Sequence, residues 1–399
     1  MRPGTLFIVL TVVLDAMGIG LIMPIMPDLI REVHGGDLAN AALWGGALAT
    51  AFALMQFLFG PVVGALSDRY GRRPVLLVSL LFMTLDYLVM ALSGSIWLLM
   101  LGRIVGGITA ATHATASAYM ADVSRPEDKA ANFGLIGAGF GIGFVLGPLM
   151  GGMLGEYGTR APFYAAAALS ALNLLFGWLV LRETVTDAIR RPFAWRRANP
   201  LGAFRQIGAH PELRQLLIVF FLYDLALYVY PSVWSYFGQA RFGWTPQLIG
   251  LSLALYGIGA AAVQILLMRW LIARRGERGT AVLGIVFEGL ACVMLAVVTS
   301  GPLALILTPI ASLGAVAMPA LQGMLSRRTG ADAQGELQGV IASVHAMAAI
   351  LSPLIMTTTF AAFTAEGARV FFPGAPFVLA ALLLGLSILV ICRTPPAAA

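Results

Sequence analysis

The stretch "RYGRR" at residues 69–73 returns in altered form as "RRGER" at residues 274–278, so a shift of 205 residues places Gly71 on Gly276. The same shift places the pair 148–149, Pro-Leu, on the pair 353–354, also Pro-Leu. Features that recur at a fixed spacing indicate an internal repeat. We therefore predict that the chain consists of two diverged halves that share one architecture.

The composition places both halves in a membrane. The chain of 399 residues is 59% hydrophobic and only 11% charged, with a mean hydropathy of +0.87. A helix of about 20 apolar residues spans the hydrocarbon core of a bilayer. Apolar runs of that kind predict twelve transmembrane helices, near 5–27, 43–65, 75–95, 97–121, 132–153, 162–181, 213–237, 247–272, 280–299, 303–325, 337–361 and 374–392. The predicted fold class is an all-α membrane protein with two pseudo-repeated six-helix bundles.

One long connection, rich in Arg and Pro, separates the two predicted bundles. It gives an N-terminal bundle at 1–181, a basic linker at 182–212 and a C-terminal bundle at 213–399. Basic residues gather at both chain ends and in alternate loops, which by the positive-inside rule face the cytoplasm. The net charge of +6 therefore reports topology and gives no reason to expect nucleic-acid binding. Both termini are predicted to be cytoplasmic.

The sequence offers little for an enzyme to use. Its two cysteines, Cys292 and Cys392, form no metal-ligand spacing, and we expect both thiols to be buried and inert. We find no combination of nucleophile, base and cofactor motif either. We predict a transporter that is not an enzyme and binds no metal or cofactor of its own.

Four acids fall near the middles of predicted spans: Asp15, Asp86, Asp224 and Glu288. A charged residue at the bilayer centre costs roughly 2.5–3.5 kcal/mol on insertion scales, and such residues mark ion and proton pathways. Acids around a water-filled cavity can take a proton from one side and release it to the other. The alternative is a static ion pair or a side chain that snorkels to the interface.

Three further titratable side chains lie within the predicted spans. Arg103 is the one basic residue at depth, so it needs a buried partner, and Asp15 and Asp86 are the candidates. His113 and His345 can titrate in the physiological range, or can be neutral packing residues. We predict proton coupling through the four acids with Arg103, and place both histidines among the candidate substrate-cavity residues.

The stretch "GALSDRYGRRP" at residues 64–74 combines glycines, an acid and arginines in a tight cytoplasmic turn. Charge pairs there can clamp two helix ends and then release them. We predict a cytoplasmic latch in which Asp68 pairs with Arg72 and Asp122 is the third member. A plain positive-inside anchor would explain the arginines but not the acid.

Glycines and tyrosines mark two other predicted helices. Glycines 137, 141, 143, 147 and 151 give small-residue spacings that favour close helix packing. In the seventh span, Tyr223 and Tyr228 could belong to an interfacial aromatic belt or stack on a drug, and both are candidate cavity residues. For Tyr236 we expect the belt.

Several of these stretches resemble the tetracycline/proton antiporters, a group of twelve-helix drug:proton antiporters in the major facilitator superfamily. The similarity covers nearly the whole chain. It is carried by "LDAMGIGLIMPIMPDLIRE" (14–32), "ALMQFLFGPVVGALSDRYGRRPVLLVSL" (53–80), "LDYLVMA" (85–91), "GRIVGGITAAT" (102–112), "FGWTPQLIGLSLA" (242–254) and "MPALQGMLSR" (318–327).

The resemblance implies export of a divalent-metal–tetracycline chelate in exchange for protons, across the bacterial inner membrane. It assigns the family's acids of the first and third helices to Asp15 and Asp86, and the fourth-helix arginine to Arg103. It also assigns the latch to Asp68 and Arg72, and a residue that lines the pathway to Gln56. A divalent metal such as Mg²⁺ would be carried as part of the substrate, and the transporter is expected to work as a monomer in the lipid bilayer.

The C-terminal half departs from the family pattern. A histidine usual in the eighth helix is replaced by Ala260, and an aspartate in the ninth helix by Glu288. Asp224 and His345 stand where the family has other residues, and we hypothesise that one of them replaces the missing histidine. The predicted function is tetracycline efflux by proton antiport. A proton antiporter of the same fold with a different or wider drug range is the alternative.

Overall fold

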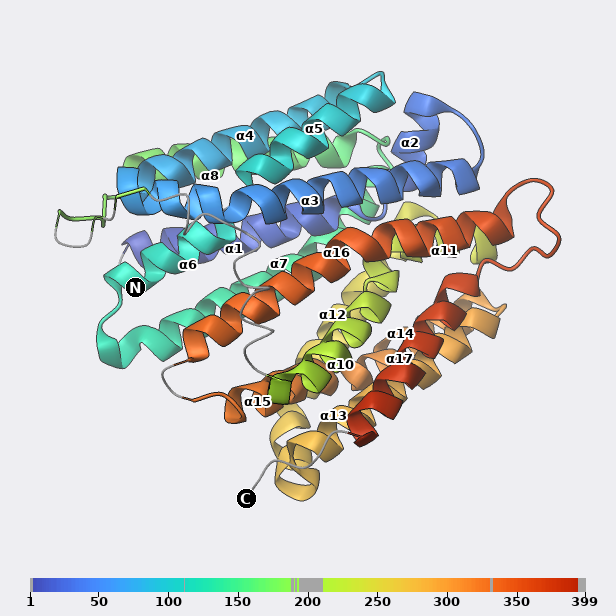
Figure 1. Cartoon of the computed structure of the whole chain (residues 1–399). Helices are drawn as coiled ribbons and strands as arrows, with labels where there is room; N and C mark the ends of the chain where they lie inside the picture. The colour runs from blue at the N-terminus through green and yellow to red at the C-terminus, as the bar shows by residue number, and fades with distance from the viewer. Residues whose placement is uncertain are drawn as a thin grey trace. The chain divides into compact units, whose positions relative to one another are not determined.

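The computed structural model describes residues 3–110, 112–187, 190, 192–193, 211–330 and 333–393. Within these ranges all the regular structure is helical (Figure 1). The helices of the first part are α1 (Pro3–Ile22), α2 (Met26–His34), α3 (Leu38–Tyr70), α4 (Arg72–Leu92), α5 (Ile96–Thr109), α6 (Thr112–Val123), η1 (Pro126–Asp128), α7 (Lys129–Gly155) and α8 (Ala161–Val180). The later part contains α10 (Pro211–Leu227), α11 (Val229–Phe242), α12 (Pro246–Leu266), α13 (Met268–Val297), α14 (Gly301–Ala311), η2 (Ser312–Val316), α15 (Ala317–Arg327), α16 (Gln334–Thr364) and α17 (Ala375–Arg393).

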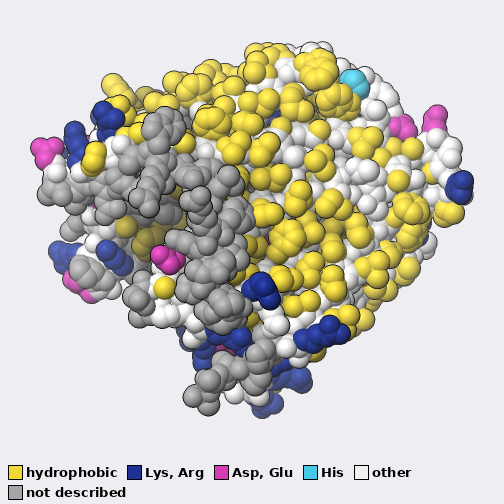
Figure 2. Space-filling model, in the orientation of Figure 1, with side chains coloured by type: hydrophobic (Ala, Val, Ile, Leu, Met, Phe, Trp, Pro, Cys, Tyr) yellow, Lys and Arg dark blue, Asp and Glu magenta, His cyan; other side chains and the backbone are white. Residues whose placement is uncertain are grey.

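Twelve helical segments among the described residues are long and apolar enough to cross a membrane. Each corresponds to one of the twelve predicted spans, so the predicted all-helical membrane fold is confirmed. Hydrophobic side chains cover most of the described surface seen in Figure 2, whereas charged side chains gather towards its margins. A bilayer can solvate such a surface, while water would not.

Several of the spans are interrupted, among them the fourth, the seventh and the tenth, and the apolar runs did not predict these breaks. The fourth span breaks between α5 and α6 after the pair Gly106–Gly107, where helix propensity is low. The seventh breaks between α10 and α11, because Pro231 has no N–H to donate to the carbonyl of Leu227 four residues earlier. The tenth contains the 3₁₀ stretch η2 between α14 and α15.

The chain divides into two compact units, which are described separately. Unit 1 contains residues Met1–Gly35, Ala51–Pro200 and Thr245–Ala254. Within it α1 packs along α7, and α4 packs against α8, α5 and α6 (Figure 1). An added Cβ on glycine 143, 147 or 151 would collide with the backbone of α1, whereas glycines 137 and 141 face open space. Three of the five glycines singled out in the sequence therefore allow α7 and α1 to approach closely.

Unit 2 contains residues Gly36–Thr50, Leu201–Trp244 and Leu255–Ala399. Its α13 packs against α17 and α15, and α10 packs against α17 and α16. Most of the predicted linker at 182–212 lies outside the described residues. The exact boundaries of the predicted bundles stay a prediction.

Candidate functional site

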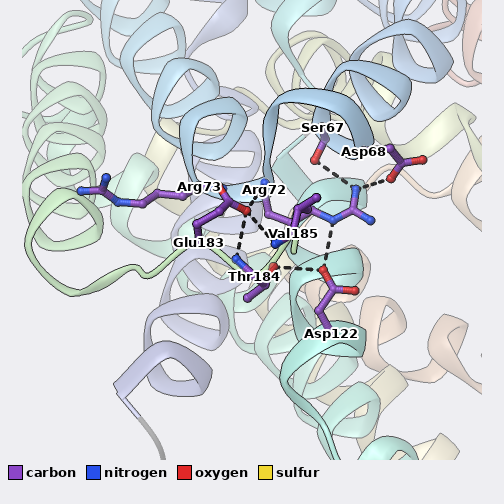
Figure 3. A network of polar contacts seen from close by, with 8 residues as sticks. All are labelled: Ser67, Asp68, Arg72, Arg73, Asp122, Glu183, Thr184 and Val185. Atoms are coloured by element: carbon purple, nitrogen blue, oxygen red, sulfur yellow. Dashed lines mark hydrogen bonds and ion pairs between the residues drawn. The ribbon is translucent and has the colours of Figure 1, made fainter. Parts of the chain in front are cut away.

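The predicted latch residues meet in unit 1 (Figure 3). Arg72 is the first residue of α4, and its Nη1 donates to Asp68 Oδ1 at 2.5 Å, in the last turn of α3. Its Nε donates to Asp122 Oδ2 at 3.2 Å, near the end of α6. One guanidinium therefore joins the ends of three helices, with the pairing expected from the sequence.

The turn before Arg72 requires glycine. Gly71 has φ 116° and ψ 154°, a backbone conformation that L side chains rarely adopt. A Cβ at this position would also collide with the carboxylate of Glu183. The chain can therefore turn from α3 into α4 and bring Arg72 back towards Asp68.

Glu183 belongs to the same network, although the sequence analysis did not single it out (Figure 3). Its Oε1 accepts hydrogen bonds from the backbone N–H groups of Arg72 (2.8 Å), Thr184 (2.9 Å) and Val185 (3.0 Å). Its Oε2 accepts one from the N–H of Arg73 at 3.2 Å. The first N–H groups of a helix have no partner within the helix, so this carboxylate caps α4. An acid two residues after the predicted sixth span was the available signal, but it was read as part of a basic linker.

Thr184 extends this contact to the latch itself. Its hydroxyl donates to Asp122 Oδ2 at 3.0 Å, the same oxygen that accepts from Arg72. The segment that leaves α8 is thereby tied to α4 and α6. The start of the predicted linker therefore belongs to the same hydrogen-bond network as the predicted latch residues.

A second ion pair lies deeper in unit 1, between Arg103 of α5 and Asp86 of α4. Of the two candidate partners for Arg103, the structure selects Asp86. Arg103 Nη2 donates to Asp86 Oδ2, while Asp86 Oδ1 is buried and has no hydrogen-bond partner among the described residues. The guanidinium also lies over the ring of Phe52, 5.0 Å from its centroid. The carboxylate thus has one paired and one unpaired oxygen.

Two glycines of α5 make room for this carboxylate. A Cβ on Gly102 would lie 2.9 Å from Asp86 Oδ1, and a Cβ on Gly106 would lie 2.8 Å from Oδ2. Both contacts are shorter than a side-chain carbon can normally make. The stretch "GRIVGG" therefore supplies both the arginine and the space for its partner.

The other candidate residues of the first half belong to neither the predicted latch nor the Asp86–Arg103 pair. Asp15 is half-buried near the middle of α1. Gln56 of α3 donates from Nε2 to the carbonyl of Ala110 at 3.2 Å, at the break between α5 and α6. This bond satisfies a carbonyl at an interrupted helix end. His113 lies in α6, and its side chain is outside the described residues.

Unit 2 brings Asp224, His345 and Tyr228 together. His345 Nδ1 of α16 lies 2.7 Å from Asp224 Oδ2 of α10, and His345 Nε2 lies 3.2 Å from the hydroxyl of Tyr228. A neutral ring that donates from Nδ1 to the carboxylate can accept at Nε2 from the tyrosine. The Asp224 side chain is 4% exposed and that of His345 is 53% exposed. The histidine therefore connects a buried acid to an accessible surface of its unit.

Glu288, which we predicted to be a proton-coupling acid, is fully buried in α13. The hydroxyls of Tyr230 and Tyr256 each donate to its carboxylate at 3.4 Å, and its side chain fills the space beside Gly314 of η2. Tyr223 is also buried, with its hydroxyl 3.5 Å from the carbonyl oxygen of Gly314. In this state Glu288 is enclosed by aromatic side chains and backbone.

Two smaller expectations are wrong. Tyr236 is not in an interfacial belt but buried, with its ring packed near that of Phe360. Cys292 is buried as expected, but Cys392 is exposed because it lies at the last turn of α17. The apolar run alone did not reveal which thiol the helix end leaves accessible.

Outside the membrane spans, Glu32 lies near the end of α2 and contacts the segment between α7 and α8. It accepts hydrogen bonds from the Thr159 hydroxyl and from Arg160 Nε, the latter at 2.9 Å. These two bonds, first Thr159 and then Arg160, hold the pKa of the Glu32 carboxyl below its ordinary value. Arg160 also donates to the carbonyl of Ala91 at 2.8 Å, so the contact reaches the end of α4.

The model of the Major Facilitator Superfamily matches residues 8–245 and 216–399 of the chain. A tetracycline resistance protein of class C from Escherichia coli is 45% identical over 353 residues, which cover 88% of each chain. The chain belongs to the family of tetracycline resistance proteins within this superfamily. A class E relative from Escherichia coli is 39% identical over 91% of this chain and 89% of its own.

The transporter's fold agrees with this assignment. The nucleoside transporter NupG superposes with a TM-score of 0.81 at 13% identity, over 98% of this chain and 98% of its own. The family and the twelve spans identify a multi-pass inner-membrane transporter rather than an enzyme. Among the described residues, no three His, Cys, Asp or Glu side chains are grouped so that they could hold a metal ion.

Proposed function

We propose that this transporter exports a divalent-metal–tetracycline chelate in exchange for inward-moving protons, by alternating access. The observation that carries the proposal is the Asp86–Arg103 pair within the membrane-spanning helices. Asp86 holds Arg103 with one oxygen, while its other oxygen is buried and has no hydrogen-bond partner in the described part of the chain. A proton on Asp86 would neutralise the carboxylate and weaken its hold on Arg103. Proton binding would thereby change the contacts between α4 and α5.

Asp224 and His345 are the proposed proton-carrying groups of unit 2. We assign them a shared role, because a proton can pass between Nδ1 and a carboxylate at hydrogen-bond distance. His345 is the more exposed partner and could exchange a proton with water before Asp224 does. In this proposal the pair takes over the part of the histidine that Ala260 replaces.

The remaining roles follow the same scheme. We propose that Asp15 and Glu288 complete the proton-coupling acids, and that Gln56, Tyr223 and Tyr228 contribute to substrate passage. Mg²⁺ or a similar ion would enter as part of the substrate. The transporter would act as a monomer, with both termini in the cytoplasm.

The test is uptake of labelled tetracycline with Mg²⁺ into inside-out vesicles that carry an imposed proton gradient. We expect uptake that collapses when an ionophore removes the gradient, and proton release when drug is added. Absence of both signals in vesicles with folded protein would contradict tetracycline antiport. A panel of other drugs, scored by proton release, would then test the alternative of a different substrate range.

A double variant tests the coupling pair. Asp224→Asn with His345→Ala should abolish gradient-driven uptake while drug exchange without a gradient continues. Tyr228→Phe is tested beside it, since it removes only the hydroxyl that contacts His345 and so separates the loss of this contact from the loss of the two titratable groups. Gradient-driven uptake at the normal rate in the double variant would exclude both residues from coupling.

A further inference from the structure

The arginine-rich turn at 274–278 repeats the backbone geometry of the turn at 69–73. The proposed function does not use this second turn. Gly276 interrupts α13 with φ 67° and ψ 176°, as Gly71 with φ 116° and ψ 154° precedes α4. Both values of φ lie in the region that favours glycine. The two turns are 205 residues apart and belong to different units.

The ion pair beside each turn is repeated with its charges exchanged. In unit 1, Arg72 follows the glycine and pairs with Asp122. The residues 205 positions later are Glu277 and Arg327, and Arg327 Nε lies 2.8 Å from Glu277 Oε1. An arginine–acid pair has become an acid–arginine pair. The attraction is retained although the sequence motif is lost.

The next residue in each turn makes the same backbone contact. Arg73 donates from Nη2 to the carbonyl of Trp178 at 2.9 Å, near the end of α8. Arg278 donates from Nη2 to the carbonyl of Cys392 at 3.1 Å, near the end of α17, and to that of Ile391 at 3.0 Å. Both receiving helices begin with Ala-Pro-Phe, at 161–163 and 375–377, and this alignment places Trp178 on Cys392. Each unit thus connects three corresponding helix ends.

We infer that Glu277, Arg278 and Arg327 form a second clamp, here called the reversed clamp, which holds the ends of α13, α15 and α17 together during transport. Alternating access of this kind of fold is largely a rigid-body motion of one repeat against the other, so each repeat must keep its helix ends together. These three are positioning residues, since they bind helix ends and not the substrate.

The reversed clamp depends on fewer contacts than the latch of unit 1. The position of Asp68 corresponds to Ala273, which has no charge to offer. Glu277 is the fixed member, because its side chain is only 16% exposed and packs against Gly323, where a Cβ would lie 2.8 Å from Oε1. Arg327 is 71% exposed. Loss of either charge should therefore loosen the end of α15 against the turn at Gly276, while the packing of the two helices remains.

The experiment compares Glu277→Gln, Arg327→Gln and the double variant Glu277→Arg with Arg327→Asp in the full chain. The double variant restores a pair with the polarity of Arg72 and Asp122. Arg275→Gln is the matched control, because it removes an exposed charge from the same turn. Two quantities are measured: backbone hydrogen exchange at 276–281 and 322–328, and the initial transport rate per molecule of protein in vesicles.

We expect each single variant to raise exchange in both segments and to lower the maximal transport rate about two- to fivefold, with KM unchanged. The double variant should recover both quantities, and Arg275→Gln should change neither. Hydrogen exchange does not depend on which drug is carried, so this readout stands whether or not tetracycline is the substrate. If Glu277→Gln does not accumulate, the loss and the recovery of the ion pair can still be compared in Arg327→Gln and the double variant.

The inference would be overturned if Arg327→Gln had the hydrogen exchange and the transport rate of the wild type. The same holds for a folded double variant that performs no better than the worse single variant, because a clamp held by charge must be restored when the charges are exchanged. A fall in thermal stability without a change in exchange or maximal rate would reduce the pair to an ordinary surface contact, and would also overturn it.

Discussion

At the scale of single residues, Asp86 shows how space and charge together fix the position of a carboxylate within the membrane-spanning helices. Gly106→Ala would place a Cβ 2.8 Å from Asp86 Oδ2 and 3.1 Å from its Cγ. The carboxylate would have to move away from Arg103, so we expect loss of transport and a loss of stability of about 1–3 kcal/mol, typical of overpacking. Uptake rates in vesicles and thermal unfolding of the purified protein measure the two effects.

Gly141→Ala is the control for this change. It is also a helical glycine in unit 1, but a Cβ there meets nothing within 4 Å. Its uptake should equal that of the wild type. If Gly106→Ala also transports normally, Asp86 and Arg103 do not need the contact seen in the structure.

Glu32 predicts a pH dependence outside the membrane. Its folded-state pKa is lowered by Thr159 and Arg160, so its contact stabilises the fold above the ordinary pKa of a glutamate and is lost as the pH falls through the lowered value. The contribution should be less than about 1 kcal/mol, because the side chain is 41% exposed. Thermal unfolding of wild type and Glu32→Gln should therefore differ near neutral pH and converge in acid. A difference that grows in acid would contradict this linkage.

At the scale of elements, the capping of α4 depends on one carboxylate. Glu183→Gln keeps one oxygen acceptor but loses the charge and the second acceptor that serve four backbone N–H groups. We expect destabilisation of about 1 kcal/mol and faster hydrogen exchange at 71–73. Asp187→Asn is the control, since its side chain is 98% exposed and pairs with Arg190 only at 3.7 Å. Equal exchange in the two variants would show that the cap does not hold α4.

The spans could be predicted from sequence but their interruptions could not. Hydrophobic length reports that a segment can lie in lipid, and it is insensitive to one unpaired carbonyl in the middle of the segment. The breaks depend on partners from other helices: Gln56 donates to Ala110 at one break, and Ser352 donates to Leu225 near another at 2.8 Å. Local signs existed in Pro231 and in the pair Gly106–Gly107, but neither fixes by itself where a helix ends.

The polar contacts also divide into those that the sequence predicted and those that it could not predict. Arg103 required a buried acid because it stood alone at depth, and the latch followed from residues four apart on one turn. Glu183 is 111 residues from Arg72, and a backbone N–H gives no sequence signature at all. His345 could be named as titratable, but its contact with Asp224 depends on how α16 packs on α10.

At the scale of the whole molecule, the repeat preserves contacts better than it preserves residue types. Arg72–Asp122 and Glu277–Arg327 are matched in position and opposite in sign. A search for one charged motif finds the first turn and overlooks the second. Pairs are retained when both members change together, because the attraction depends only on the charges being opposite.

The orientation of the whole chain can be tested with its own cysteines. Cys392 is exposed at the last turn of α17, whereas Cys292 is buried, so the wild-type protein should present one reactive thiol. The basic residues predict that the C-terminus is cytoplasmic. A membrane-impermeant maleimide should therefore label inside-out vesicles and leave intact cells unlabelled. Cys392→Ser should remove the signal without affecting transport, and labelling of intact cells at Cys392 would reverse the predicted topology of all twelve spans.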